Sequence, residues 1–272
     1  MFERLDKLPV DPILGLMAAF RADADTQKID LGVGVYRDER GDTPILAAVR
    51  QAEEQVLSRQ KSKVYVAAAG NADFNQAMER LTLGADHPAL AAKRVRTIQA
   101  PGGCGALRLG AELLRIASPD TVIHVSTPTW ANHVPLLTGA GIKLERYPYY
   151  DPATGGVSFD AMLSHLDRLP ARSVVLLHAS CHNPTGADLD QAQWRDVLGV
   201  VKRRELIPYL DMAYQGLGDG ADADAYGVRI FAAEMPEVLV AVSCSKNFGL
   251  YRERTGALHV LRATQAAADA IL

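Results

Sequence analysis

Residues 173–214, "SVVLLHASCHNPTGADLDQAQWRDVLGVVKRRELIPYLDMAY", contain the pattern that decides the fold. The runs at 173–180 and 206–214 are short and mostly apolar, which is typical of strands buried on both faces of a sheet. Between them, residues 190–205 show the apolar spacing of a helix. A strand, a helix and a second strand in this order predict two parallel strands joined by a crossover helix.

The same alternation extends through most of the chain. Further apolar runs are found at 96–100, 121–126, 143–150, 238–246 and 256–261, and helical patterns at 12–23, 44–56, 71–83 and 101–117. Buried strands that alternate with helices predict an α/β protein. We expect a mainly parallel, mixed central sheet with helices on both faces.

Composition limits the classes of function. The 272 residues are 48% hydrophobic and 22% charged, with a formal net charge of -3 and no long block of one sign. This balance argues against nucleic acid or an anionic membrane as a partner. No run reaches the roughly 18 apolar residues of a membrane-spanning helix, and the N-terminus lacks the apolar core of a signal peptide.

The cysteines also bear on the compartment. Cys104, Cys181 and Cys244 form no CxxC pair, so neither a disulfide framework nor a zinc knuckle is indicated. A reducing cytoplasm is therefore the expected location. His178 and His182 lie near Cys181, but no carboxylate completes a ligand set, and we predict no metal site.

Polar residues follow the predicted strands, where open parallel sheets bind their ligands. Gly102 and Gly103 open a helix, so backbone N–H groups there could approach an anion, although an ordinary strand-to-helix turn explains a glycine pair equally well. The segment matches neither a Walker A loop nor a dinucleotide fingerprint. Trp130 could stack on a flat ring or pack in the core.

Three further strand-end residues have alternative interpretations. Asp211 closes a buried strand, where a carboxylate either meets a charged partner or caps a helix. Asn183 precedes Pro184 and is therefore held out of helical geometry. Lys246 follows the run at 238–242 and is either an exposed surface lysine or a reactive amine.

Taken together, these residue types match the needs of pyridoxal 5'-phosphate (PLP). A lysine amine forms a Schiff base with the PLP aldehyde, and a carboxylate pairs with the pyridinium nitrogen. Phenol and amide donors hold the ring oxygen. Hydroxyls, backbone amides and an arginine bind the phosphate, and each charge-assisted hydrogen bond contributes about 1.5–3 kcal/mol.

Several motifs then identify a family. They are "DPILGL" (11–16), "LGVGVYRDE" (31–39), "PGGCGALR" (101–108), "CHNPTGADL" (181–189), "DMAYQG" (211–216) and "SCSKNFGLYRER" (243–254). In this order they resemble the aspartate and aromatic-amino-acid aminotransferases, which are class I PLP enzymes of fold type I. "GADHP" (84–88) and "LPARSVVLLH" (169–178) favour the aromatic branch.

The resemblance implies a role for each matched position. Lys246 is the expected Schiff-base lysine and proton carrier, Asp211 the pyridinium partner and Tyr214 a donor to the ring oxygen. Asn183 is expected to bind the ring oxygen and the substrate carboxylate, with His133 supporting Asp211. Trp130 is expected over the ring and Gly34 near the substrate carboxylate. The expected phosphate ligands are Gly103, Cys104, Ser243, Ser245 and Arg254, completed by Tyr65 from a second subunit.

The resemblance also predicts the domain organisation. Residues 1–11 would form an N-terminal arm, 12–43 the first segment of a small domain and 44–272 the PLP-binding large domain. Cys104 stands where the family usually has threonine or serine, and a thiol is the weaker donor. The family's substrate-binding arginines lie beyond the position of Leu272, so we expect a chain with an incomplete small domain.

The leading hypothesis for function is PLP-dependent amino-group transfer. An aromatic amino acid or aspartate would donate to a 2-oxo acid such as 2-oxoglutarate by a ping-pong mechanism, in a cytoplasmic homodimer. The alternative is a truncated, non-catalytic remnant that at most binds PLP. A nicotinamide oxidoreductase is a third possibility that rests only on the glycine turn.

Overall fold

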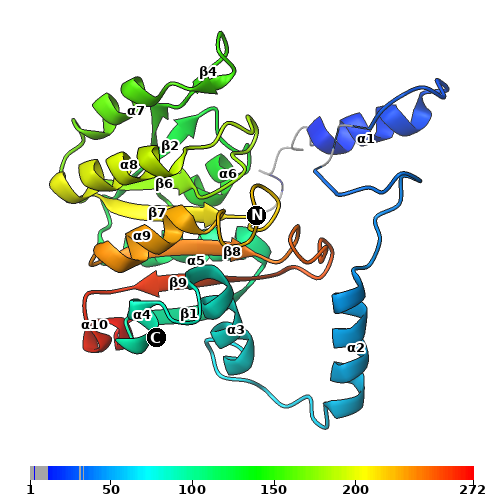
Figure 1. The fold of residues 1–272 in the computed structure, drawn as a ribbon, viewed down its shortest axis with the longest axis horizontal. Helices are drawn as coiled ribbons and strands as arrows, with labels where there is room; N and C mark the ends of the chain where they lie inside the picture. The colour runs from blue at the N-terminus through cyan, green and yellow to red at the C-terminus, as the bar shows by residue number, and fades with distance from the viewer. Residues whose placement is uncertain (1–2, 4–11, 31, 33) are drawn as a thin grey trace. The chain divides into compact units, whose positions relative to one another are not determined.

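The computed structural model describes residues 3, 12–30, 32 and 34–272, which divide into the units 1–44 and 45–272. The N-terminal unit contains α1 (Pro12–Ala22) and an ion pair of 2.7 Å between Arg37 and Asp30. The arm predicted at residues 1–11 lies, apart from residue 3, outside the described residues. All other helices and strands named below belong to the larger unit (Figure 1).

A central sheet organises the larger unit. Among the described residues it has seven strands, in the order β1 (Val95–Pro101), β9 (Thr255–Leu261), β8 (Val238–Ser243), β7 (Ile207–Met212), β6 (Val174–His178), β2 (Val122–Thr127) and β3 (Lys143–Pro148). The five strands from β8 to β3 run parallel to one another, whereas β9 runs antiparallel to both of its neighbours, β1 and β8. The predicted mainly parallel, mixed sheet is confirmed.

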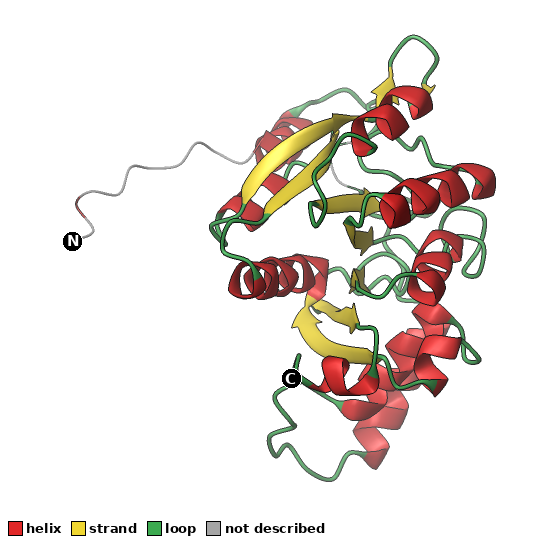
Figure 2. Ribbon diagram, turned by 90° about the vertical axis from the view of Figure 1, so that its left-hand side faces the viewer, coloured by secondary structure: helices red, strands yellow, loops and turns green. Residues whose placement is uncertain are grey.

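Helices cover both faces of this sheet (Figures 1 and 2). One face packs against residues of α3 (Ala72–Leu83), α4 (Pro88–Ala91), α7 (Phe159–Leu166), α8 (Gln191–Arg203) and α9 (Tyr226–Glu234). The opposite face packs against α5 (Gly102–Ala117) and α6 (His133–Thr138). The remaining elements are α2 (Ala47–Arg59), α10 (Gln265–Asp269) and the hairpin of β4 (Tyr150–Asp151) with β5 (Gly156–Val157). None of the helices in the described part of the chain is long and apolar enough to cross a membrane.

The apolar runs became strands because their side chains are buried alternately on the two faces. In β6, Val175 and Leu177 belong to the core beneath α8 and α9, whereas Leu176 belongs to the core beneath α5. Two buried faces leave no position for a polar side chain, so the run is continuous. The next helix, α8, then begins at a capping box in which Asp190 and Gln193 exchange side-chain and backbone hydrogen bonds.

Candidate active site

Strand register brings the predicted site residues to one edge of the sheet. Asp211 of β7 pairs with His178 at the end of β6 on one side and with Ala241 of β8 on the other. Ser243, the last residue of β8, pairs with Gly256 of β9. The carboxyl ends of the parallel strands and the segments that follow them therefore meet at this edge.

Lys246 lies in the segment directly after β8. Its side chain is half-buried, and its Nζ is 5.0 Å from the centroid of the Tyr214 ring, within cation–π range. Burial lowers the pKa of Lys246 below its usual value, although Asp211 and Cys104 act in the opposite direction. A lowered pKa increases the fraction of neutral amine, which is the nucleophilic and basic form.

Asp211 is a buried carboxylate with a defined partner. Its side chain is 7% exposed, and its Oδ2 is 3.0 Å from Nε2 of His133, which is fully buried. Burial opposes ionisation, but the hydrogen bond from His133 helps to hold the pKa of Asp211 below its usual value. The carboxylate is thus kept ionised inside the protein, as pairing with a cationic ring would require.

A directed chain of hydrogen bonds leads from Asn183 to Asp211. The backbone N–H of Asn183 donates to Nδ1 of His178 at 3.4 Å, and Nε2 of His178 is 3.2 Å from Oγ1 of Thr129. This hydroxyl lies 2.8 Å from Nδ1 of His133, whose Nε2 faces Asp211.

The chemistry of the groups fixes the direction of this chain. An amide N–H can only donate, so Nδ1 of His178 accepts and its Nε2 carries the proton. Thr129 then accepts from His178 and donates to His133, which leaves Nε2–H of His133 for Asp211. Burial lowers the pKa of His178 to about 3, so the neutral tautomer that this direction needs is the one present at neutral pH.

Tyr214 and Asn183 face each other beside Lys246. Nδ2 of Asn183 donates to the Tyr214 hydroxyl at 3.3 Å, and the Asn183–Pro184 peptide bond is cis. Burial raises the pKa of Tyr214, so the phenol keeps its proton at neutral pH. One O–H donor and one amide N–H donor therefore converge at this point, and together they could hold a ring oxygen.

A cup of hydrogen-bond donors surrounds the N-terminus of α5. Arg254 donates from Nη1 to Oγ of Ser245 at 3.2 Å, and its Nη2 lies 3.8 Å from Sγ of Cys104. The side chain of Ser243 also lies here, with its Oγ accepting from the backbone N–H of Ser245 at 3.2 Å. A guanidinium, two hydroxyls and a helix N-terminus are the groups that bind a phosphate.

Glycine is required where the cup closes. Gly102 has a φ of +70°, and a Cβ there would lie 2.8 Å from Nη2 of Arg254. At Gly103 a Cβ would lie 3.2 Å from Cβ of Ser243. The double glycine therefore allows Arg254 and Ser243 to approach the helix N-terminus closely.

Three other residues predicted for the site are Trp130, Tyr65 and Gly34. Trp130 packs edge-on against His133, with ring centroids 5.3 Å apart and planes at 85°. Tyr65 is fully exposed in the segment between α2 and α3. Gly34 belongs to the N-terminal unit. The predicted roles of all three stay predictions.

Sequence reasoning missed the roles of Thr129 and His182. Thr129 links two histidines, and the available signal was its position four residues before His133, just after a strand. The sequence pattern suggests His178 and His182 only as candidate metal ligands, whereas in the structure their ring nitrogens form hydrogen bonds with hydroxyls and an amide. Within the described residues, no group of three or more metal-ligating side chains gathers.

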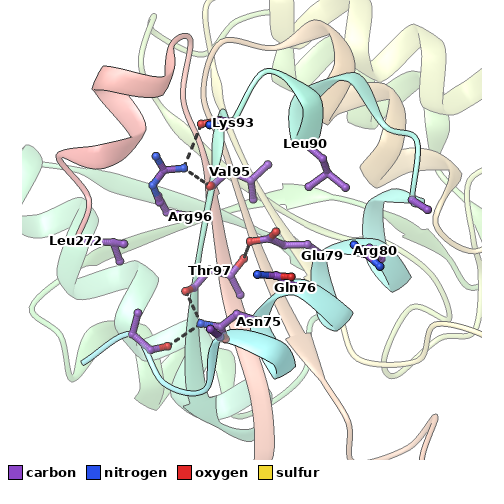
Figure 3. A pocket seen from close by; sticks show the side chains of 13 residues that line it. Asn75, Gln76, Glu79, Arg80, Leu90, Lys93, Val95, Arg96, Thr97 and Leu272 are labelled. Carbon is purple, nitrogen blue, oxygen red and sulfur yellow. Dashed lines mark hydrogen bonds between the residues drawn. The ribbon is translucent and has the colours of Figure 1, made fainter. Parts of the chain in front are cut away.

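A separate cavity of about 560 Å³ lies between α3, α4 and β1 (Figure 3). Oγ1 of Thr97 lies 2.6 Å from Oε1 of Glu79 on one side of the hydroxyl and 2.8 Å from Nδ1 of His259 on the other. The described residues that line this cavity include none of the predicted site residues. It is therefore distinct from the cluster at the strand ends.

Comparison with known proteins shows the family of the chain. The family model "Aminotransferase class I and II" matches residues 26–271, so the chain belongs to that family. An aromatic-amino-acid aminotransferase of Pseudomonas aeruginosa is 51% identical over 259 residues, covering 95% of this chain and 65% of that relative. An aspartate aminotransferase of the same organism is 46% identical, covering 96% of this chain and 66% of the relative.

A solved structure gives the same result for the fold. The aromatic-amino-acid aminotransferase of Burkholderia pseudomallei, described as covalently bound to pyridoxal phosphate, is 46% identical with a TM-score of 0.97. The match covers 100% of this chain and 68% of that chain. The chain is thus a homologue of the PLP-dependent aromatic and aspartate aminotransferases, and its α/β sheet has the fold-type I architecture over part of their length.

Proposed function

We propose that the chain binds PLP and transfers amino groups from an aromatic amino acid or aspartate to a 2-oxo acid. One observation carries this proposal: Lys246, Asp211 and Arg254 lie in a single cluster at the carboxyl edge of the sheet. An amine, a buried carboxylate and a guanidinium there correspond to the aldehyde, the pyridinium nitrogen and the phosphate of PLP.

The residues present fit the cofactor. Arg254, Ser243, Ser245, Cys104 and the N–H groups that begin α5 would hold the phosphate, in a cup that side chains at Gly102 or Gly103 would fill. Asp211 would pair with the ring nitrogen, while Tyr214 and Asn183 would donate to the ring oxygen and Trp130 would cover the ring. When bound, PLP supplies an electron sink for the bond that is broken at Cα of the amino acid.

Lys246 would both hold the cofactor and move the proton. Its lowered pKa favours the neutral amine, which can attack the aldehyde and later accept the Cα proton. The pyridinium partner must stay negative at the same time. The hydrogen-bond chain that ends at Asp211 serves this purpose, because His133 donates to the carboxylate.

Absorbance measures cofactor binding, and product analysis measures transfer. PLP added to the purified chain should produce the absorbance band of lysine-bound cofactor, and Lys246→Ala should abolish it. Tyrosine or aspartate should then yield one equivalent of its 2-oxo acid per bound PLP. The cofactor proposal fails if the wild-type chain and Lys246→Ala respond alike to PLP.

The second candidate function is PLP binding without amino transfer. The observation that favours it is that the chain spans 65% of the length of the Pseudomonas aeruginosa aromatic relative, so about a third of that relative lies outside the matched region. A chain that shows the absorbance band but releases no 2-oxo acid from tyrosine or aspartate would support this candidate and contradict the first.

A cytoplasmic homodimer would complete the assembly, with residues 12–43 as a small-domain segment and 44–272 as the large domain. Support for a dimer comes from α2 and the segment after it: α2 has no buried residue, and Leu57, Val64 and Tyr65 are almost fully exposed. Unpaired apolar side chains of this kind favour a protein interface. Sedimentation should show a dimer that Leu57→Asp weakens; a wild-type monomer at all concentrations would contradict it.

A further inference from the structure

His182 is a buried imidazole to which the proposed chemistry assigns no role. It is 2% exposed in the loop between β6 and α8. Its Nε2 lies 2.9 Å from Oγ of Ser126, and its Nδ1 lies 2.9 Å from Oγ1 of Thr185. A neutral imidazole has one donor and one acceptor nitrogen, and a hydroxyl can serve either, so both pairs are satisfied without charge.

The ring of His182 belongs to a continuous row of aromatic and imidazole rings. Tyr149 stacks on one side of it, with centroids 4.0 Å apart and planes at 13°, and His178 packs on the other side at 4.1 Å. The row of rings continues from His178 to His133, with centroids 5.1 Å apart, and from His133 to Trp130, with centroids 5.3 Å apart. It connects the segment after β3 with the residues around Asp211.

The loop that carries His182 is tied at its base. The backbone N–H groups of Cys181 and His182 donate to the carboxylate of Asp188 at 2.7 and 2.8 Å. The Tyr149 hydroxyl donates to the carbonyl of Ala187 at 2.7 Å. These contacts hold the two ends of the loop together, and the side chain of His182 connects the loop to the sheet through Ser126 of β2.

We propose that His182 is a positioning residue that fixes Asn183 in the cofactor site. Asn183 follows His182 directly, its backbone N–H joins His178, and its side chain meets the Tyr214 hydroxyl. With His182 locked between Tyr149 and His178, the amide of Asn183 has a defined place beside Tyr214. This inference rests on the proposed function, because Asn183 and Tyr214 are the proposed ligands of the PLP ring oxygen.

The absence of charge on His182 and His178 supports the positioning role of His182. Burial lowers the pKa of His182 to about 4 and that of His178 to about 3, so both rings are neutral at neutral pH. Neutral rings can stack without like-charge repulsion. Like-charge repulsion between these two histidines therefore does not disturb the row of rings at neutral pH, where the site would work.

The test combines amide hydrogen exchange without PLP and PLP affinity. In His182→Leu, amides of residues 181–188 should exchange at least about tenfold faster, while those of β7 and β8 stay unchanged. PLP should bind about tenfold more weakly, which corresponds to losing one hydrogen bond of about 1.4 kcal/mol. His182→Gln, which keeps a hydrogen-bonding side chain of similar length, should recover part of the affinity.

A double-mutant comparison separates positioning from general stability. If His182 acts through Asn183, the variant carrying both His182→Leu and Asn183→Ala should bind PLP no more weakly than Asn183→Ala alone. His124→Leu is the matched control, because His124 is 3% exposed on the same strand as Ser126. It should reduce stability without reducing PLP affinity.

Two results would overturn the inference: additive losses in the double variant, or unchanged exchange of residues 181–188 in His182→Leu. A wild-type chain that binds no PLP would instead contradict the proposed function. Hydrogen exchange would then still decide whether His182 orders the loop, because that measurement needs no cofactor.

Discussion

At the scale of single residues, the position of Asp211 determines its chemistry. A carboxylate that is 7% exposed is unfavourable unless its charge is stabilised, and the hydrogen bond from His133 provides the largest stabilising contribution. The hydrogen-bond chain through Thr129 and His178 fixes His133 as the donor in this hydrogen bond. Asp211 thus remains an acceptor with its charge available for a cationic partner.

Replacing the carboxylate of Asp211 should reduce cofactor function more than folding. Asp211→Asn keeps the shape but removes the charge, so PLP affinity and amino-transfer rate should each fall about 10- to 100-fold, the equivalent of one charge-assisted hydrogen bond. Absorbance titration and 2-oxo acid release measure the two effects. Glu237→Gln, at a surface ion pair with Arg262, is the control and should change neither; equal effects of the two variants would contradict the assignment.

Cys104 offers a gain-of-affinity test. Its thiol lies 3.8 Å from Nη2 of Arg254 in the proposed phosphate cup, and a hydroxyl is the stronger donor to phosphate. Cys104→Ser should therefore tighten PLP binding about 2- to 10-fold, from about 0.5–1.5 kcal/mol for one hydrogen bond. Cys181→Ser, which replaces a thiol outside the cup, should have little effect. Weaker binding by Cys104→Ser would count against the proposed phosphate cup.

At the scale of elements, the start of α5 depends on glycine more than on helix propensity. Gly102 combines a φ of +70° with a Cβ position 2.8 Å from Nη2 of Arg254. An alanine there would face both a strained backbone and a displaced guanidinium. The glycine turn thus couples the helix start to the proposed phosphate cup.

A pair of glycine substitutions tests this coupling. Gly102→Ala should lower the free energy of unfolding by about 1–2 kcal/mol from the positive φ alone, and it should also weaken PLP binding. Gly199→Ala, inside α8 where a Cβ meets nothing within 4 Å, should instead raise stability by about 0.5–1 kcal/mol. Chemical denaturation measures both changes. Similar effects of the two alanines would show that the turn has no special requirement.

Most elements could be predicted because buried parallel strands leave an uninterrupted apolar signal. The strand predicted at 143–150 was wrong in its extent, since the chain leaves the sheet after Pro148 and re-pairs as β4 at Tyr150. Tyr149 turns inward at this point, where its ring stacks on His182 and its hydroxyl reaches Ala187. Local pattern could not reveal this contact, because its partners are more than 30 residues away.

The candidate site was predictable in its members but not in its connections. Lys246, Asp211, Tyr214 and Asn183 each lie at or just after the end of a predicted strand, and parallel strands bring such ends together. The link from His178 to His133 through Thr129 depends on distances across the sheet, which the sequence does not contain.

At the scale of the whole molecule, buried neutral histidines make stability depend on pH. Burial lowers the pKa of His178 to about 3 and the pKa values of His182 and His259 to about 4. In the unfolded chain these groups titrate near pH 6.5. Their stabilising effect is complete above that pH and is lost as the pH falls toward 4, because only the unfolded chain then binds the protons.

His259 allows the contribution of a single histidine to this pH dependence of stability to be measured, because it lies outside the proposed site. The free energy of unfolding should fall between pH 7 and pH 5.5, and each such histidine should contribute at most about 1.4 kcal/mol per pH unit below its unfolded pKa. His259→Gln cannot take up a proton, so its loss over this range should be about 1 kcal/mol smaller. Urea unfolding at both pH values measures the difference; identical pH dependence in wild type and His259→Gln would show that His259 is not neutral in the folded protein.

The most direct test of PLP binding at Lys246 is to identify the lysine that PLP modifies. The chain is incubated with PLP, reduced with borohydride to fix the link, digested and mapped by peptide mass spectrometry. The phosphopyridoxyl group is expected on Lys246, and Arg254→Ala and Asp211→Asn should reduce the yield at that position. Label distributed over other lysines, with Lys246 unmodified, would show that Lys246 is not the PLP-binding lysine.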